Sequence, residues 1–515
     1  MKRKRLAGWL GMGLAAVMAA GVLGGCGNTS ETSGNSAEES REESTSQSSA
    51  EVGQSQESGG VDESEAAAPE VELPESISWW THDGLNEEDY VKEWDAAFEE
   101  LSGIRLEHTQ VSNNEYQELL EIAFTSQTEP NVFDLPCDQK LAYYASQGAV
   151  ADLTDLIKES GLYDKIDADV WEAIALDGKI YGIPTDMPTG IVNYVRKDWL
   201  DRLNMEVPTN YEEYIEMLRA FRDNIDECTI PLTAPGLTAA MNLPEFYWDA
   251  EADFTYKDGK WVDGMLEENF PVAMQRLHDA YAEGLIDVEA VTNTTSNCRD
   301  KWYSGAVGVF SYWDGKWGNT LHTRLQENFP EAELIGIPAI DESYYRYTTF
   351  SVKCIDGRLS EEEARQVFYG FFGNITDGAD GQILFACGVE GLHHEIGEDG
   401  RIQYLNMVSA PDSVFQSVWG LPANAVFPFE NTDILPVQPD KAVETHEVIL
   451  EDGVYKFTTP SSETLNTITS DLKAIRDELI AKMVMGDISV EEGMDTYRQK
   501  AESLSVDKVL EEMNR

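Results

Sequence analysis

The stretch that most constrains the fold runs from Gly178 to Leu200 and reads GKIYGIPTDMPTGIVNYVRKDWL. Its first part, Lys179–Ile183, is a short run of β-forming residues that follows a turn pair and closes at Pro184. Because each proline fixes its own backbone and restricts the residue before it, Pro184 and Pro188 keep the residues between them extended. The apolar run Ile191–Val195 predicts a second strand, followed by the start of a helix. A strand that stops at a rigid kink and then resumes predicts a chain that passes from one lobe to another, with polar groups of the kink facing a cleft.

The first 26 residues have the composition of an export signal. Lys2–Arg5 is a charged start, Leu6–Val22 is an apolar run, and Leu23-Gly24-Gly25-Cys26 places small residues before a cysteine. This ending resembles a bacterial lipobox, which implies that Cys26 becomes the mature N-terminus and carries a diacylglycerol thioether. Two acyl chains hold a protein stably at a membrane, whereas one chain is marginal. An uncleaved anchor helix is the alternative, and with either anchor the body lies at the outer face of the bacterial cytoplasmic membrane.

Residues 27–75 are rich in Ser, Glu, Gly and Ala and contain almost no aromatic residues. Such a segment buries too little apolar area to offset its ordering entropy, so we expect a disordered tether. As a flexible coil it would span roughly 40 Å, enough for the body to clear the lipid headgroups. The length of the whole chain alone favours about three domains, but with this part unfolded two lobes fit better.

The net charge of -58 argues against a nucleic-acid partner, because no basic segment beyond the first five residues is available to neutralise phosphates. Five further cysteines show neither a CxxC pair nor metal-ligand spacing. We expect most of them to be buried as small apolar residues, with one disulfide left open. They are Cys137, Cys228, Cys298, Cys354 and Cys387.

Strand and helix patterns alternate after the tether, which predicts a parallel α/β layer. The expected elements are a strand at 77–80, an amphipathic helix at 87–102, a strand at 104–109, a helix near 116–126 and an apolar run at 131–135. Ligands of such sheets bind outside the carboxyl ends of the strands. The candidate residues at these ends are Trp79, Trp80, Asp83, Cys137 and Asp138.

The second half of the chain continues with mixed patterns. The expected elements are a helix at 211–221, a hairpin turn at 257–260, a helix at 270–283, a strand at 308–312, a return crossing at 334–338, a strand at 348–353, a helix at 361–372 and two helices with apolar stripes at 465–479 and 490–504. Trp313, Lys316 and Trp317 follow the strand at 308–312. We read the two final stripes as core-packing faces, with a coiled coil as the minor alternative.

Several segments, among them NYVRKDWLDRLN, VPTNYEEYIEMLRAF and NVFDLPCDQKLAYYASQGAVADL, resemble extracellular solute-binding proteins of ABC importers. The closest resemblance is to the carbohydrate-type, maltose-binding-like group and its oligosaccharide lipoproteins, from about Ile77 to the C-terminus. It implies an α/β, two-lobe, periplasmic-binding-protein-like (type II) fold with a hinge and an interlobe cleft. The division it implies is residues 76–185 with 340–400 for the N-terminal lobe and 186–339 with 401–515 for the C-terminal lobe. The hinge would lie near 182–189 and 335–339.

A sugar site needs aromatic walls and polar edges together, because a pyranose ring stacks its C–H face on a flat ring while its hydroxyls pair with forked polar groups. In the family, the loop after NVFDL carries an aromatic and a charged residue; here Pro136 and Cys137 depart from that pattern and leave Asp138. Asp314 is a further candidate polar edge, and ordinary core packing is the alternative for any one tryptophan. The predicted ligand-binding residues are Trp80, Asp83, Asp138, Asp186, Met187, Thr189, Trp248, Trp313, Lys316 and Trp317.

Catalytic motifs do not emerge from the sequence. His393-His394-Glu395 lacks the histidine spacing of a zinc protease helix, and Ser470–Lys473 fits S-x-x-K only on an amphipathic helix. Neither G-x-S-x-G nor a phosphate-binding loop occurs, so ATP-driven transport would place the nucleotide site on another chain. We therefore expect no catalytic residue, no metal and no cofactor.

The resemblance implies a monomeric, lipid-anchored receptor that captures an oligosaccharide or other small solute and delivers it to the transmembrane subunits of an ABC permease. Two alternatives stay open. One is a lipid-anchored, glycan-degrading enzyme, which would need two carboxylates across the cleft. The other is a peptide or amino-acid receptor of the same fold, with a charged clamp to which Arg196, Arg299 and Lys316 could contribute.

Overall fold

The computed structural model describes residues 71–82, 88–405 and 422–515. The chain divides into two units, Met1–Ala66 and Ala67–Arg515, and the first unit lies wholly outside the described residues. The predicted signal segment with Cys26, most of the predicted tether, and Asp83 also lie outside them. No helix of the described ranges is both long and apolar enough to cross a membrane.

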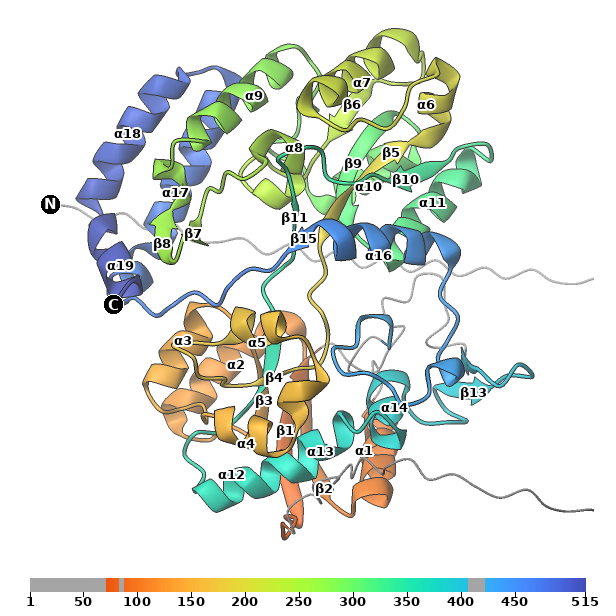
Figure 1. The fold of residues 1–515 in the computed structure, drawn as a ribbon, viewed down its shortest axis with the longest axis vertical. Coiled ribbons are helices and arrows are strands. Elements are labelled where there is room, and N and C mark those ends of the chain that lie inside the picture. The colour runs from red at the N-terminus through yellow and green to blue at the C-terminus, as the bar shows by residue number, and fades with distance from the viewer. Residues whose placement is uncertain (1–70, 83–87, 406–421) are drawn as a thin grey trace, which may run out of the picture. The chain divides into compact units, whose positions relative to one another are not determined.

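One half of the second unit, which we call lobe 1, is built on a five-stranded sheet of order β2-β1-β3-β12-β4 (Figure 1). Its elements before the chain first leaves it are β1 (Ser76–His82), α1 (Glu88–Ser102), β2 (Arg105–Val111), α2 (Asn113–Ser126), β3 (Val132–Pro136), α3 (Gln139–Ser146), α4 (Thr154–Glu159), α5 (Ala168–Ile174) and β4 (Ile183–Pro184). β1 runs parallel to β2 and β3, so the expected parallel layer is confirmed. After the chain returns, β12 (Ser351–Ile355) inserts antiparallel between β3 and β4.

The other half, lobe 2, is built on a four-stranded sheet of order β10-β5-β9-β6. Its elements are β5 (Ile191–Arg196), α6 (Lys197–Leu203), α7 (Tyr211–Asn224), β6 (Ile230–Thr233), α8 (Pro244–Tyr247), β7 (Phe254–Lys257), β8 (Lys260–Asp263), α9 (Phe270–Ala282), α10 (Thr295–Tyr303), β9 (Val307–Trp313), α11 (Lys316–Asn328) and β10 (Leu334–Gly336). All six residues of β5 are buried, because helices cover both faces of this central strand.

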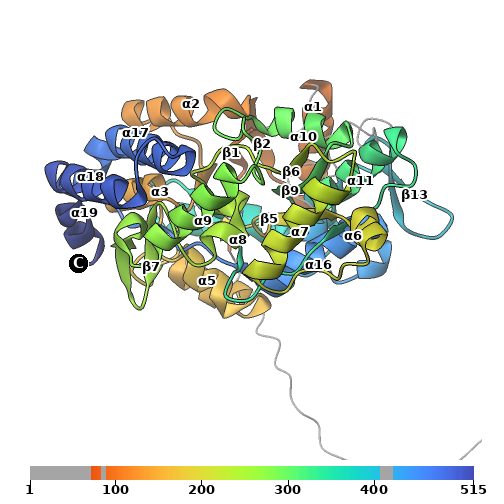
Figure 2. The same ribbon diagram turned by 90° about the horizontal axis from the view of Figure 1, so that it is seen from above.

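The rest of the chain adds small strands and helices. They are β11 (Tyr345–Arg346), α12 (Glu361–Val367), a π-helical turn (Phe368–Phe372), α13 (Gly373–Ile375), α14 (Asp380–Cys387), β13 (His394–Ile396), β14 (Ile402–Tyr404), α16 (Asp440–Asp452), β15 (Gly453–Val454), α17 (Glu463–Met485), α18 (Val490–Ser503) and α19 (Val506–Met513). Figures 1 and 2 show α17 and α18 beside α9, and their predicted apolar stripes do pack into a core.

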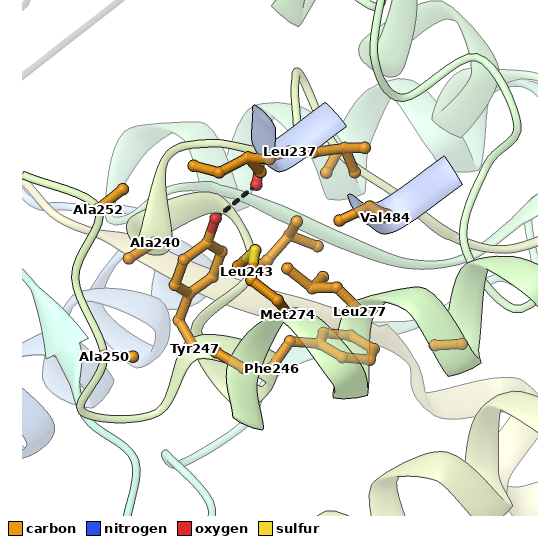
Figure 3. Packing of buried hydrophobic residues seen from close by; sticks show 14 of the residues in the cluster. Leu237, Ala240, Leu243, Phe246, Tyr247, Ala250, Ala252, Met274, Leu277 and Val484 are labelled. Atoms are coloured by element: carbon orange, nitrogen blue, oxygen red, sulfur yellow. Dashed lines mark hydrogen bonds between the residues drawn. The ribbon is translucent and has the colours of Figure 1, made fainter. Parts of the chain in front are cut away.

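Each lobe has its own apolar core. The core of lobe 1 gathers residues from Ile77 to Phe427, and the main core of lobe 2 gathers residues from Val195 to Met513. Figure 3 shows part of the latter, where the Tyr247 ring lies among aliphatic side chains and its hydroxyl donates to the Leu237 carbonyl oxygen at 2.7 Å. A buried phenol needs such an acceptor, because an unpaired hydroxyl in a core is costly. Two separate cores match the predicted two-lobe class.

Three segments connect the lobes, and the first two contact each other. The first, Thr185–Gly190, meets the second, Ile337–Phe350, where the Thr348 N–H donates to the Thr189 carbonyl at 2.9 Å. The third, residues 436–439, leads from lobe 1 into α16. A later segment, residues 455–462, runs from α16 to α17 and stacks Tyr455 on Tyr347 of the second connection, with ring centroids 5.0 Å apart. We call the three connecting segments crossover 1, crossover 2 and crossover 3.

Two local predictions were wrong. Lys179–Ile183 does not form one strand: Lys179 folds back in a tight turn onto Leu176, and only Ile183–Pro184 is strand. The predicted return crossing at 334–338 is instead mainly β10, which pairs with β5 in lobe 2, so the chain returns later, through crossover 2. The five cysteines are buried and free, as expected for most of them.

The predicted division of the chain between the lobes stays a prediction. Several contacts bear on its boundary at residue 400: β14 pairs with β13, and Phe427 packs in the core of lobe 1. The later helix α16 packs against α11 and strands of lobe 2.

Candidate functional site

Asp138 lies directly after β3, at the carboxyl edge of the lobe 1 sheet. Its Oδ1 accepts the Lys140 N–H at 2.7 Å and so caps α3. Burial raises the pKa of Asp138, while the Lys140 N–H and the charges of Lys140 and Lys456 oppose that rise. Because Lys456 lies between α16 and α17, this edge of lobe 1 faces a segment that begins and ends in lobe 2.

The two tryptophans of β1 point to opposite faces of the sheet, as alternation along a strand requires. Trp79 is fully buried and stacks on His108 with ring centroids 4.5 Å apart, so it is a core residue. Trp80 is half-buried and stays a candidate. Asp83, the third predicted residue of this edge, falls outside the described residues.

Asp186 and Met187 lie on crossover 1, and a second segment holds them there. The Met187 N–H donates to the Asn424 carbonyl at 2.7 Å, and the Val426 N–H donates to the Thr185 carbonyl at 3.1 Å. Beside this pairing is a small pocket of about 10 Å³, close to the size that one water molecule requires. It is lined by Thr185, Asp186, Ile375, Thr376, Gln382, Phe385, Ala386, Ala425, Phe427 and Phe429.

Trp313 ends β9 next to the start of β5, so the fold joins it to crossover 1. The following residue, Asp314, exchanges two hydrogen bonds with Gly190: its N–H donates to the Gly190 carbonyl at 3.1 Å, and its Oδ1 accepts the Gly190 N–H at 3.2 Å. Its Oδ2 lies 2.6 Å from Nδ1 of His446 on α16. Trp313 itself is half-buried, and its carbonyl accepts the Tyr194 hydroxyl at 2.6 Å.

Gly190 has no room for a side chain at this junction. A Cβ there would lie 2.4 Å from Ile449 Cδ1 and 3.2 Å from the Arg346 carbonyl oxygen. Gly190 also bridges to Tyr347 of crossover 2. Four parts of the chain therefore meet at this one glycine: crossover 1, crossover 2, the end of β9, and α16.

Lys316 and Trp317 open α11 just beyond Trp313. Burial lowers the pKa of Lys316. The Trp317 ring meets Tyr312 edge-on at 5.2 Å, and the Arg299 guanidinium lies 4.9 Å from its centre. The described contacts of the Trp317 ring are therefore with lobe 2 itself.

Trp248 follows α8 with a positive φ of 39°. The centre of its ring lies 4.2 Å from the Arg276 guanidinium. The same guanidinium also lies 4.1 Å from the centre of the Tyr211 ring. The ring of Trp248 thus packs on α9 and the lobe 2 core, while its carbonyl accepts the Arg346 guanidinium of crossover 2 at 2.7 Å.

The structure places Thr189 beside Gly190, whose hydrogen bonds with Asp314 join it to the end of β9 at Trp313, whereas Asp186 and Met187 pair with residues 424–425. Sequence reasoning missed His446, which lies in an acidic helix 132 residues away from Asp314 and carries no motif. It also missed the pairing of crossover 1 with residues 424–426. Asp314 was considered as a ligand-facing edge, but its carboxylate is taken by Gly190 and His446.

Within the described parts of the chain, no group of three or more His, Cys, Asp or Glu residues is placed to hold a metal ion. The arrangement offers an aromatic ring, half-buried carboxylates and backbone polar groups at the segments that connect two lobes. Such a site suits a ligand with both apolar faces and hydroxyl groups.

Comparisons with known proteins agree with this architecture. The family model "Bacterial extracellular solute-binding protein" matches residues 84–338. A polygalacturonan/rhamnogalacturonan-binding protein of Bacillus subtilis, YtcQ, is 22% identical over 491 residues, covering 88% of this chain and 93% of its own. Lipoprotein LipO of the same organism is 21% identical over 327 residues, covering 59% and 64%.

A solved structure extends the comparison to the fold. An HMO-binding, ABC-transporter-associated solute-binding protein from Bifidobacterium longum infantis superimposes with a TM-score of 0.64 at 15% identity, covering 85% of this chain and 97% of that one. At this identity the likeness shows the fold alone.

Proposed function

We propose a ligand and a mode of capture for this chain, which belongs to the bacterial extracellular solute-binding proteins. The ligand is an oligosaccharide, bound between lobe 1 and lobe 2 and delivered to the transmembrane subunits of an ABC permease. The observation that carries the proposal is the junction at Gly190, which joins the end of β9, where Trp313 is followed by Asp314, to two of the three segments that connect the lobes. The names of the relatives support a saccharide and an ABC transporter.

We propose that the two lobes close around the ligand, with the junction at Gly190 between them. Hinge closure around a ligand is a common transition of two-lobe proteins. A ligand shifts such an equilibrium only by its difference in affinity for the two states. A saccharide that contacts both lobes binds the closed form better, and the closed form presents both lobe surfaces to the permease together. Closure thereby signals to the permease that a saccharide is bound.

The residues proposed to hold the saccharide divide by lobe. Trp313 supplies a flat ring at the end of β9, and Lys316 and Trp317 follow it in lobe 2. Trp80 and Asp138 contribute from the lobe 1 edge, with Asp186, Met187 and Thr189 on crossover 1. Asp83 and Trp248 stay predictions without a further observation in their support.

The anchor and the surroundings are proposed from the sequence. Lipidated Cys26 holds the protein at the outer face of the cytoplasmic membrane, as the lipobox-like ending suggests and as the similarity to a lipoprotein supports. The protein acts as a monomer, takes part in no catalysis and needs no cofactor.

A ligand screen tests the proposal directly. We expect oligosaccharides of one glycan class to raise the melting temperature of the purified protein, because a ligand that binds only the folded form stabilises it by mass action. Differential scanning fluorimetry against matched panels of oligosaccharides and peptides measures this. A shift from peptides with none from any saccharide would contradict the proposal, as would cleavage products after long incubation with the bound glycan.

A further inference from the structure

Glu245, in the short helix α8, is a carboxyl group sealed inside lobe 2. The residue is 1% exposed, and neither side-chain oxygen has a hydrogen-bond partner among the described residues. The side-chain nitrogen of Asn193, on β5, is buried and lacks a partner in the same described set. The side chains of Asn193 and Tyr345 approach the Glu245 carboxyl closely enough to lower its pKa as hydrogen-bonding groups, although neither contact has the geometry of a well-formed hydrogen bond. Three buried polar atoms without partners in one place are costly unless something satisfies them.

Asn193 is also where crossover 1 and crossover 2 attach to lobe 2. Its carbonyl accepts the Ile337 N–H at 3.0 Å, where crossover 2 begins, and its own N–H donates to the Tyr345 hydroxyl oxygen at 3.4 Å. The Tyr345 hydroxyl donates in turn to the Ile337 carbonyl at 2.8 Å. Crossover 1 enters β5 only two residues before Asn193. The orphaned atoms of Glu245 and Asn193 therefore lie at the root of two of the connections between the lobes.

We infer that Glu245, Asn193 and Tyr345 form an internal site that binds one proton and fixes both crossovers to lobe 2. In the protonated form Glu245 has one O–H donor and one carbonyl acceptor, and Asn193 has its amide N–H donors. The neutral carboxyl therefore offers the Asn193 amide an acceptor without burying an unpaired charge. The Asn193 side-chain oxygen already accepts the Ser311 hydroxyl, so this amide is oriented with its nitrogen toward the site.

The charges around the site agree with a bound proton. Burial raises the pKa of Glu245 to about 7, and its own backbone N–H, Asn193, Arg346 and Tyr345 oppose this rise only in part. The Arg346 guanidinium is already engaged by Glu251 and by the carbonyl oxygens of Trp248 and Ala250. The titratable and charged groups that face this site are Tyr214 of α7, Tyr345 and Arg346 of β11, and, further out, Tyr194 of β5, Glu251, and Asp452 of α16.

The bound proton makes the anchorage depend on pH. Between the pKa of a free glutamate, about 4.5, and about 7, the folded protein holds a proton that the unfolded chain has released. The contribution of Glu245 to stability is therefore largest at low pH, falls as the pH rises through this window, and is lowest above about 7. Above that pH a buried carboxylate weakens the hold of Asn193 and Tyr345 on crossover 2. That this would alter lobe closure rests on the proposed function; the site itself does not.

The variant Glu245→Gln tests the site, since glutamine keeps the shape and stays neutral. We expect its melting temperature to equal that of the wild type at pH 5 and to exceed it by about 2–4 °C or more at pH 8. We also expect the Ile337 amide of the wild type to lose hydrogen-exchange protection relative to Glu245→Gln above pH 7. The exposed Glu268→Gln, in the same lobe, should leave the difference flat across this range.

Either of two results would overturn the inference. One is a melting-temperature difference between Glu245→Gln and the wild type that does not change from pH 5 to pH 8. The other is a Glu245→Gln variant whose melting temperature lies below that of the wild type at pH 8. Neither measurement uses a saccharide, so failure here leaves the proposed function untouched, and failure of the ligand screen leaves this site untouched.

Discussion

Replacing Lys353 by methionine is expected to lower the free energy of unfolding by about 3–5 kcal/mol. Lys353 on β12 lies opposite Asp134 on β3, with 2.7 Å between Nζ and Oδ1, and both side chains are about nine-tenths buried. Its ammonium also lies 5.4 Å from the centre of the Phe385 ring. Removing it leaves a carboxylate without its counter-charge in the middle of the lobe 1 sheet. Chemical denaturation followed by tryptophan fluorescence measures the change.

Two further variants separate the loss of the pair from the loss of a side chain. Asp134→Leu combined with Lys353→Met removes both charges, and we expect it to recover most of the stability because apolar replacements of a buried pair are often neutral. Arg498→Met breaks an exposed pair with Asp495 and should cost less than about 1 kcal/mol. A loss below 1 kcal/mol in Lys353→Met alone would show that the buried pair does not stabilise the sheet as its geometry indicates.

Replacing Trp313 by alanine is expected to weaken saccharide binding by roughly 100-fold, while the protein stays folded. The magnitude follows from the behaviour of buried aromatic anchors in binding sites, where truncation costs about 2 kcal/mol or more. Trp313 is half-buried and sits at the junction of β9 with crossover 1, so part of the residue is accessible to a ligand. Isothermal titration calorimetry with the glycan that gives the largest thermal shift measures the change.

Trp248→Ala is the matched comparison. Its ring rests against Arg276 and the lobe 2 core, so we expect its affinity to stay within a few-fold of the wild type. An equal loss of affinity in the two variants would show that Trp248 also contributes to the saccharide site. An unchanged affinity in Trp313→Ala, with the fold intact by circular dichroism, would remove the residue on which the proposed site depends.

Local patterns predicted much of the fold because they depend on neighbouring residues. The helix at Glu463–Met485 and the hairpin of β7 and β8 follow from apolar periodicity and a turn pair, and both are present. The strand predicted at Lys179–Ile183 was wrong because the residues before it, Asp177 and Gly178, both have a positive φ and close a tight turn onto Leu176. This turn overrides the β propensity of the side chains that follow. A propensity says little about which strand, if any, a short segment pairs with.

The site was harder to predict because its parts are distant in sequence. Nothing near Asp314 indicates that its carboxylate holds Gly190 and His446 rather than facing a ligand. Likewise, Trp79 and Trp80 are adjacent and chemically identical, and only the direction of the strand decides that Trp79 is core. In the sequence Glu245 looks like an ordinary exposed helix residue. It is buried only because β5, α7 and β11, which are distant in the chain, pack around it.

The most direct test of the account is a distance between the lobes with and without saccharide. Spin labels at Glu118 on α2 and Thr323 on α11, both exposed, report this distance by pulsed electron resonance. If the lobes close on the ligand, the distribution of distances between the two labels moves several ångströms to shorter values when the glycan saturates the protein. An identical distribution under conditions where calorimetry shows full binding would contradict capture by closure of two lobes.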